Sequence, residues 1–552
     1  MRRGIWSYLA KKMQRRLWGI GLLTLAQMGH ALLGVMFALG TRGVIDGAVS
    51  GESGVFWHAV LCQAAIVAGI LITLTVARFL KERLRAELER DWKQDLLRGL
   101  LRGDYAQVSA YHSGELLTRL NGDVDKVNEG VLSIIPTVAA MVTRLVAAAA
   151  VLGMLDFSLA VPVLLLGVIV ILLTGFVRRK LKDLNKQVSH WDGKVSGFVQ
   201  ESMDSLLMIQ SLDVSEEVAR RGDDLLDGRF EIQRRRKTVT VLANTAVSLL
   251  HYGAGFVALV WCAGKIMAGL MTFGSLSAVI QLVNQLQKPF VELSGILPQY
   301  AALTAAAERL MELDAVTGDV TPAADREKLY ENMLALEGQD LSFGYDRQPV
   351  LENVSFRVPK GAFAVVTGAS GQGKSTLLKL LLGIYPPRAG QLRLQTPAGE
   401  IPLDRSARRL FAYTPQGNLL LSGTLRENLT LVRPEATEEE IQHALHVSDL
   451  AAVVAQLPQG LETLLGESGA GLSEGQGQRL AIARAVLSGA PVLLLDECTS
   501  ALDESTEARV LQRLRQLDDR TCIIVTHRPG AKQLCDWQLH MENGQIRSTP
   551  MA

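Results

Sequence analysis

Residues 362–378 read Ala-Phe-Ala-Val-Val-Thr-Gly-Ala-Ser-Gly-Gln-Gly-Lys-Ser-Thr-Leu-Leu and decide the fold of the C-terminal part of this chain. The first six residues form an apolar run typical of a buried strand, and the last ones begin an apolar-periodic helix. Between them lies Gly-x-x-x-x-Gly-Lys-Ser, whose glycines let the backbone curl so that successive N–H groups point at phosphate oxygens. The new helix adds the positive end of its dipole. The stretch therefore predicts a strand–loop–helix unit that binds a nucleoside triphosphate.

The loop supplies most of the predicted nucleotide ligands. Lys374 can reach the β- and γ-phosphates, and Ser375 can hold Mg²⁺. The predicted set is Gly368, Ala369, Ser370, Gly371, Gln372, Gly373, Lys374, Ser375 and Thr376.

A second apolar run, residues 491–495, ends in the acids Asp496 and Glu497. An acid at the carboxyl end of a strand faces the nucleotide in folds of this kind. Asp496 is therefore predicted as a second Mg²⁺ anchor, and Glu497 as the carboxylate that orients the attacking water. Taken alone, the pair could equally mark the start of a helix, but the phosphate loop favours the catalytic interpretation.

Residues 472–479, Leu-Ser-Glu-Gly-Gln-Gly-Gln-Arg, resemble the signature of ABC transporter ATPase domains. Glu474 and Gly477 depart from the pattern of many relatives, at positions that need not donate to phosphate. Four further positions match family motifs in order: the adenine-stacking aromatic, the glutamine loop, the loop after the acid pair and the switch histidine. These are Tyr345, Gln416, Asp503 and His527.

The resemblance implies ATP and Mg²⁺ as cofactors and two chains working head to tail. Ser473, Gly475 and Gln476 of one chain would act on the ATP held by the other. It implies Mg²⁺ contacts from Ser375, Gln416 and Asp496. The catalytic set it implies is Glu497, His527, Lys374 and Gln416.

The N-terminal part predicts six membrane-spanning helices, because a bilayer core takes about 20 mostly apolar residues as helix. Buried helices of a soluble protein rarely reach that length without charge. The predicted spans are Leu17–Gly40, Val55–Leu80, Val131–Leu155, Phe157–Val177, Val239–Met267 and Phe273–Leu303. Lysine and arginine crowd the N-terminal segment, the connections after the second and fourth spans and the stretch before the fifth span, which predicts both termini and the ATPase domain in the cytoplasm of a multi-pass cell-membrane protein.

The connections at 81–130 and 178–238 are long, charged and helical in pattern, so they predict helical levers or solvated stalks. Residues 114–124 and 200–213 resemble the cytoplasmic loops of exporter-type ABC proteins, and Glu467 lies in a stretch that touches those loops in that family. We therefore expect Asp104–His112 and Leu206–Val214 to dock onto the ATPase domains. The predicted fold is a six-helix transmembrane domain (1–315), a linker (316–334) and an α/β P-loop ABC ATPase domain (335–552).

The resemblance implies an ATP-driven half-transporter that pairs with a second copy of itself. A homodimer is favoured because the residues that hold ATP and those that act on the ATP of the other chain are all present. A heterodimer, an importer of exporter shape, a soluble ABC ATPase and a nucleotide-regulated receptor are the alternatives. Net charge is +1 and the five cysteines are scattered, which argues against nucleic acid as a partner and for a reducing compartment.

The predicted substrate is a small amphiphile or peptide. Polar residues on one face of the sixth span, from Gln281 and Gln285 to Lys288 and Glu292, predict a mixed cavity that meets a zwitterionic or peptide-like molecule. Pairing with a neighbouring helix is the alternative.

Overall fold

The computed structural model describes the backbone of residues 2–316, 325–345, 348–417, 420–466, 469, 471–517 and 519–551. Several side chains within 164–180 and 290–297 lie outside its described part. The chain forms two compact units, here called the helical unit (residues 1–101 and 111–316) and the sheet unit (residues 102–110 and 317–552). Glu467, from the stretch expected near the cytoplasmic loops, lies outside the described residues.

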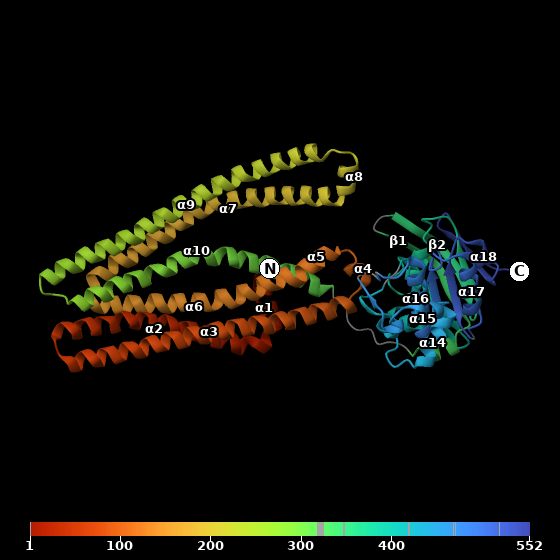
Figure 1. Cartoon of the computed structure of the whole chain (residues 1–552), viewed down its shortest axis with the longest axis horizontal. Helices are drawn as coiled ribbons and strands as arrows, with labels where there is room; N and C mark the ends of the chain where they lie inside the picture. The colour runs from red at the N-terminus through yellow and green to blue at the C-terminus, as the bar shows by residue number, and fades with distance from the viewer. Residues whose placement is uncertain are drawn as a thin grey trace. The chain divides into compact units, whose positions relative to one another are not determined.

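Long helices make up the helical unit, and α9 alone has 53 residues. The elements are α1 (Arg2–Lys12), η1 (Gln14–Arg16), α2 (Leu17–Ser50), α3 (Ser53–Arg102), α5 (Ser113–Thr118), the π-turn η2 (Arg119–Asp123), α6 (Val124–Leu155), α7 (Phe157–Asp204), α8 (Leu206–Ser211), α9 (Ser215–Met267) and α10 (Phe273–Ala315). Helix α6 packs against α10 and α2, while α7 runs beside α9 (Figure 1). A Cβ on Gly130 of α6 would come within 2.4 Å of Leu303 on α10, so this glycine permits the close approach of the two helices.

Four helices in the described part are long and apolar enough to cross a membrane: Gln14–Ser50, Ser53–Arg102, Ser113–Leu155 and Ser215–Met267. The predicted fourth and sixth spans fall in α7 and α10, which contain the side chains left undescribed. Helices α3, α7 and α9 continue well past the predicted spans. The prediction that the charged connections are helical is therefore confirmed for these stretches.

An ion pair with a buried carboxylate joins the region between α3 and α6 to the end of α10. Arg309 Nε and Nη2 each donate to a carboxylate oxygen of Asp123 at 2.7 Å, and Asp123 is 1% exposed. Burial raises the pKa of Asp123, but hydrogen bonds from Arg309 and Lys126 outweigh it and hold that pKa below its ordinary value. Both Arg119, which donates to the Arg309 carbonyl, and Asp123 belong to the stretch at 114–124 singled out from the sequence.

The sheet unit contains one six-stranded and one four-stranded sheet, in the orders β12-β11-β3-β10-β9-β6 and β2-β1-β4-β5, and a two-stranded pair β7-β8. Its strands are β1 (Ala335–Tyr345), β2 (Gln348–Pro359), β3 (Phe363–Thr367), β4 (Ala389–Thr396), β5 (Gly399–Pro402), β6 (Phe411–Thr414), β7 (Gly423–Thr424), β8 (Leu464–Leu465), β9 (Val492–Asp496), β10 (Thr521–Val525), β11 (Trp537–Glu542) and β12 (Gln545–Pro550). Its helices are α4 (Tyr105–Val108), α11 (Arg326–Glu331), α12 (Lys374–Leu381), η3 (Arg405–Leu410), α13 (Leu425–Thr430), α14 (Glu438–Val447), α15 (Ala451–Gln456), η4 (Gly460–Glu462), α16 (Glu474–Leu487), α17 (Glu504–Arg515) and α18 (Pro529–Lys532).

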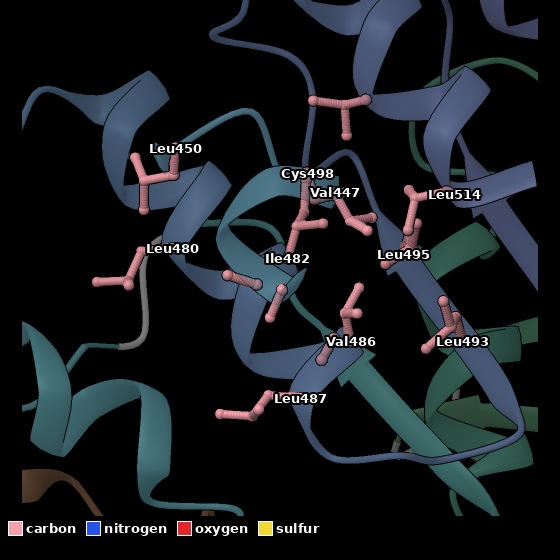
Figure 2. Packing of buried hydrophobic residues seen from close by; sticks show 14 of the residues in the cluster. Val447, Leu450, Leu480, Ile482, Val486, Leu487, Leu493, Leu495, Cys498 and Leu514 are labelled. Carbon is pink, nitrogen blue, oxygen red and sulfur yellow. The ribbon is translucent and has the colours of Figure 1, made fainter. Parts of the chain in front are cut away.

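Strands β3, β10 and β9 are fully buried, as expected for parallel strands covered on both faces. Alternate residues of these strands enter two different hydrophobic clusters. Leu493 and Leu495 pack with helix α16 and its neighbours, as Figure 2 shows, while Leu494 packs with α12 and β1 on the other face. This two-sided packing fixes the strand ends from which the candidate site is built.

Candidate nucleotide-binding site

The register of the central strands brings four loops to one edge of the sheet. Val525 at the end of β10 lies opposite Val366 of β3 on one side and Asp496 of β9 on the other. Thr414 at the end of β6 lies opposite Leu495. Because these strands are parallel, the segments that follow them, which carry the phosphate-binding loop, the acid pair, the glutamine loop and the switch histidine, leave from the same edge.

The loop between β3 and α12 has the conformation that its glycines permit. Gly373 has a φ of +91°, and a Cβ there would lie 2.6 Å from Val350 Cγ1. Lys374, 6% exposed, donates from Nζ to the carbonyls of Gly368 and Ala369 at 3.0 and 2.9 Å. Burial lowers the pKa of Lys374, although Glu497 and Asp496 act in the opposite direction. The ammonium group is thus held within the loop by weak neutral acceptors that an anion could replace.

Ser375 and Asp496 meet directly, with Ser375 Oγ donating to Asp496 Oδ1 at 3.0 Å. Two neighbouring ligands of an octahedral Mg²⁺ with bonds of about 2.1 Å are about 3.0 Å apart, so the donor set fits this ion. Tyr413 donates to the other oxygen of Asp496 at 3.1 Å. Within the described residues, no group of three His, Cys, Asp or Glu side chains is arranged to hold a metal.

Three of the predicted catalytic side chains converge beside this pair. Gln416 Nε2 donates to Glu497 Oε2 at 2.8 Å, and His527 Nε2 lies 3.4 Å from Glu497 Oε1. Glu497 has a φ of +47°, a left-handed conformation that costs a non-glycine residue about 1–3 kcal/mol. Its N–H donates to the Val525 carbonyl at 3.0 Å, which holds the residue in that conformation.

The predicted signature residues form the start of α16. Ser473 is the N-cap and makes a capping box with Gln476, while a Cβ on Gly475 would lie 2.9 Å from the Ala501 carbonyl. Asp503 caps α17 by accepting from Thr506 N at 3.0 Å. Among the described residues, no recorded contact joins Ser473, Gly475 or Gln476 to the phosphate-binding loop of the same chain.

Tyr345 lies beside the phosphate-binding loop, with its hydroxyl 3.3 Å from Thr376 Oγ1. Its ring is 5.4 Å from Tyr385, edge to face, and Tyr385 meets Tyr105 of α4 at 6.1 Å. Arg405 also donates to the Gly103 carbonyl at 3.1 Å. The short α4 segment therefore docks within the sheet unit, as expected for the first part of Asp104–His112.

Two residues that support the site, Tyr413 and Arg528, were not predicted from the sequence. Tyr413 belongs to the same Tyr-Thr-Pro-Gln stretch as Gln416, so its position on β6 was a usable signal. Arg528, next to His527, donates to the Ser500 and Leu502 carbonyls at 2.7 and 2.6 Å. It thereby holds the loop before Asp503, and only the fold reveals this contact.

The predicted polar face of the sixth span is wrong in part. Gln285 donates to the Gly34 carbonyl at 2.7 Å and packs against α2, as the alternative interpretation held. Lys288 is exposed and, unlike Glu292, does not line the cavity described below. Helix α10 is therefore turned so that only the end of the predicted stripe reaches this cavity.

Comparisons with known proteins agree with this architecture. The family model for the ABC transporter transmembrane region matches residues 20–290, and the ABC transporter model matches residues 351–500. A bacterial Atm1-family ABC exporter, solved with ATP bound, has a TM-score of 0.81 at 23% identity and covers 98% of this chain and 95% of its own. At that identity the likeness shows the fold, and the predicted fold class is confirmed.

Two relatives were compared with this chain in sequence identity and in length. A multidrug efflux ATP-binding/permease protein of Mycobacterium bovis is 30% identical over 99% of this chain but 46% of the relative. The chain thus spans about half the length of that protein. An ATP-dependent lipid A-core flippase of Chromobacterium violaceum is 28% identical over 87% of this chain and 83% of the flippase.

Proposed function

This chain belongs to the ABC transporter superfamily, and from that premise we propose that it is an integral membrane protein that hydrolyses ATP to move an amphiphilic molecule across the bilayer. The observation that carries the proposal is the convergence of Lys374, Ser375, Asp496 and Glu497 at one sheet edge, in a chain that also contains long apolar helices. Relatives named for multidrug efflux and for lipid A-core flipping support an amphiphile as substrate.

The proposed roles follow from the contacts. Lys374 exchanges its two loop carbonyls for phosphate oxygens, which are stronger acceptors for an ammonium group. Ser375 and Asp496 hold Mg²⁺, with Gln416 as a further contact, and this ion supplies charge neutralisation on the phosphates. Tyr345 stacks on the adenine.

Glu497 accepts a hydrogen bond from the attacking water, and Gln416 and His527 hold its carboxylate in position from opposite sides. The strained backbone at Glu497 is maintained by the hydrogen bond to β10, and thus by the strand that also leads to His527.

Two chains act together in this proposal. The N-terminus of α16 presents N–H groups and a positive dipole end that suit an anion. Because these groups make no contact with the loop of their own chain, we assign them to the ATP of a second copy. Both termini and the sheet unit face the cytoplasm, in accord with the lysine and arginine bias, and transport runs outward.

Hydrolysis and transport are tested on the full chain in lipid nanodiscs and in proteoliposomes. We expect Mg²⁺-dependent ATP hydrolysis that Glu497→Gln abolishes, and ATP-driven movement of an amphiphile that requires the same carboxylate. Hydrolysis at the same rate in wild type and Glu497→Gln would overturn the assignment.

A further inference from the structure

The helical unit contains a cavity of about 270 Å³ between α2, α3, α6 and α10. Its polar lining includes His30, Arg78, Lys81, Arg144 and Glu292, which come from all four helices. We call it the cationic cavity, because three full positive charges face one carboxylate.

The cavity lies toward the predicted cytoplasmic side of the membrane-spanning helices. At 1.5 Å per residue, Arg144 is about 18 Å from the turn at Asp156, Glu292 about 30 Å from Thr272 and Arg78 about 38 Å from Ser53 along their helices. A hydrocarbon core is about 30 Å thick, so in the proposed orientation Arg144 lies within the core, whereas Glu292 and Arg78 lie at or beyond its cytoplasmic boundary. An ionisable side chain within the core, such as Arg144, is energetically costly there and usually has a functional role.

The protein does not satisfy the cations fully. Lys81 donates to Glu129 at 2.8 Å, whereas Arg144 reaches Glu292 only at 3.4 Å. A guanidinium has five N–H donors, and among the described residues Glu292 is the single acceptor recorded for Arg144. Arg78 makes no hydrogen bond or ion pair to any described residue. The positive charges and N–H donors of the lining therefore outnumber the acceptors that Glu292, the one acidic residue of the lining, provides.

An occupant with several acceptor oxygens and a negative charge meets this excess, since arginine binds phosphate and carboxylate groups through paired hydrogen bonds. Apolar side chains accompany the charges: Leu74 and Ala77 line the cavity, and Leu71 and Phe79 of the same helix α3 are exposed. An acyl or alkyl chain could extend over this surface from a headgroup held inside.

We propose that the cationic cavity binds the anionic headgroup, a phosphate or carboxylate, of an amphiphile, and that Glu292 competes with this headgroup for Arg144. This inference rests on the proposed transport function and names its substrate class. It replaces the zwitterionic substrate predicted from Lys288 and Glu292, since Lys288 does not reach the cavity. Arg78 and Arg144 are the principal contacts of the headgroup, and Lys81 adds charge.

Binding is measured on the full chain in nanodiscs of zwitterionic lipid, with dodecyl phosphate and laurate as probes. Dodecyltrimethylammonium, which shares their chain length, and inorganic phosphate, which has no chain, are the comparisons. We expect both anionic amphiphiles to bind at least about tenfold more tightly than either comparison. Equal affinity for the cationic amphiphile overturns the proposal, and equal affinity for inorganic phosphate overturns an amphiphile as the occupant.

Variants locate the binding. Arg78→Gln and Arg144→Gln should each weaken dodecyl phosphate binding about tenfold to a hundredfold, the value of hydrogen bonds to charged groups. Glu292→Gln should tighten it, because the competitor is removed. Lys288→Ala is the matched control, a cation of the same helix outside the cavity, and should bind as wild type does. Unchanged affinity in both arginine variants, or weaker binding in Glu292→Gln, overturns the proposal.

ATP hydrolysis in the same preparations separates the two proposals. Glu497-dependent hydrolysis without headgroup preference contradicts only the cationic cavity. Headgroup binding without hydrolysis contradicts the transport function and leaves the cavity as a binding site.

Discussion

The nucleotide site and the cationic cavity handle charge in different ways. At the sheet edge, Lys374 donates to carbonyls of its own loop, and Asp496 and Glu497 each contact a side chain from another segment. In the cavity, the charged groups come from three helices, and Arg78 contacts no charged group among the described residues. The sheet edge is preorganised before ligand arrives, whereas the cavity leaves part of its hydrogen bonding to an occupant. The comparison shows that strand register alone brings the groups of the sheet edge together, whereas the cavity depends on how separate helices pack against one another.

Removing the catalytic carboxylate tests the preorganised site most severely. We expect Glu497→Gln to lower the ATP turnover rate at least about 100-fold, because the amide is neutral and cannot act as a base toward the water, while ATP affinity stays within about threefold. Lys374→Ala should instead weaken ATP binding about tenfold to a hundredfold, because a charge-assisted hydrogen bond to phosphate is lost. Titration with fluorescent ATP measures the affinity, and phosphate release measures the turnover rate. Loss of ATP binding in both variants would mean that the two side chains do not have distinct roles.

The pair Asp123–Arg309, whose carboxylate is buried, tests what a paired charge contributes to the stability of the helical unit. Asp123→Asn should cost about 2 kcal/mol of stability, because hydrogen bonds to a charged group are lost, and it should lower the midpoint temperature of thermal unfolding in detergent. Asp125→Asn is the matched control, since Asp125 starts the same helix without an ion pair among the described residues. A similar fall in the control would show that the pair itself contributes little.

The difference in unfolding midpoint temperature between wild type and Asp123→Asn should depend on pH in one direction. The folded pKa of Asp123 lies below its ordinary value of 3.8, so the carboxylate stabilises the fold above that value. The contribution is lost as pH falls from about 4 through the folded pKa, where both states become protonated. The difference in midpoint temperature of thermal unfolding between wild type and Asp123→Asn should therefore become smaller below about pH 4. A gap that widens there would contradict the ion pair as its cause.

Sequence reasoning succeeded best where residues are neighbours along a motif or follow adjacent strands. The phosphate-binding loop and the acid pair predicted that Ser375 and Asp496 share one site. In the structure Ser375 Oγ lies 3.0 Å from Asp496 Oδ1. The cavity could not be predicted in this way. Periodicity alone shows that Gln285 and Glu292 share a face of α10, but the packing of Gly34 decides which of them meets α2 and which meets Arg144. No pattern within one helix contains that information.

The α4 segment contacts the nucleotide site within the sheet unit. Its Tyr105 meets Tyr385, which meets Tyr345 beside the phosphate-binding loop. Tyr105→Ala removes an aromatic pair worth about 0.5–1.5 kcal/mol. We expect basal ATP hydrolysis to stay within about twofold, while stimulation by dodecyl phosphate disappears. Tyr105→Phe keeps the ring and should keep stimulation. Undiminished stimulation in Tyr105→Ala would remove α4 from the coupling path.

The smallest expected effect comes from two helix caps of the same kind in the sheet unit. Thr437 of α14 and Ser473 of α16 both form capping boxes, with Glu440 and Gln476. Replacing either residue with alanine should cost about 1 kcal/mol of stability, because one N–H group of the first turn loses its acceptor. Only Ser473→Ala should also lower the ATP turnover rate, since the start of α16 is proposed to act on the ATP of the second chain. Urea unfolding and phosphate release, measured on both variants, separate a structural cap from a functional one. If the two variants lose stability equally and both hydrolyse ATP at the wild-type rate, the N-terminus of α16 has no part in the reaction.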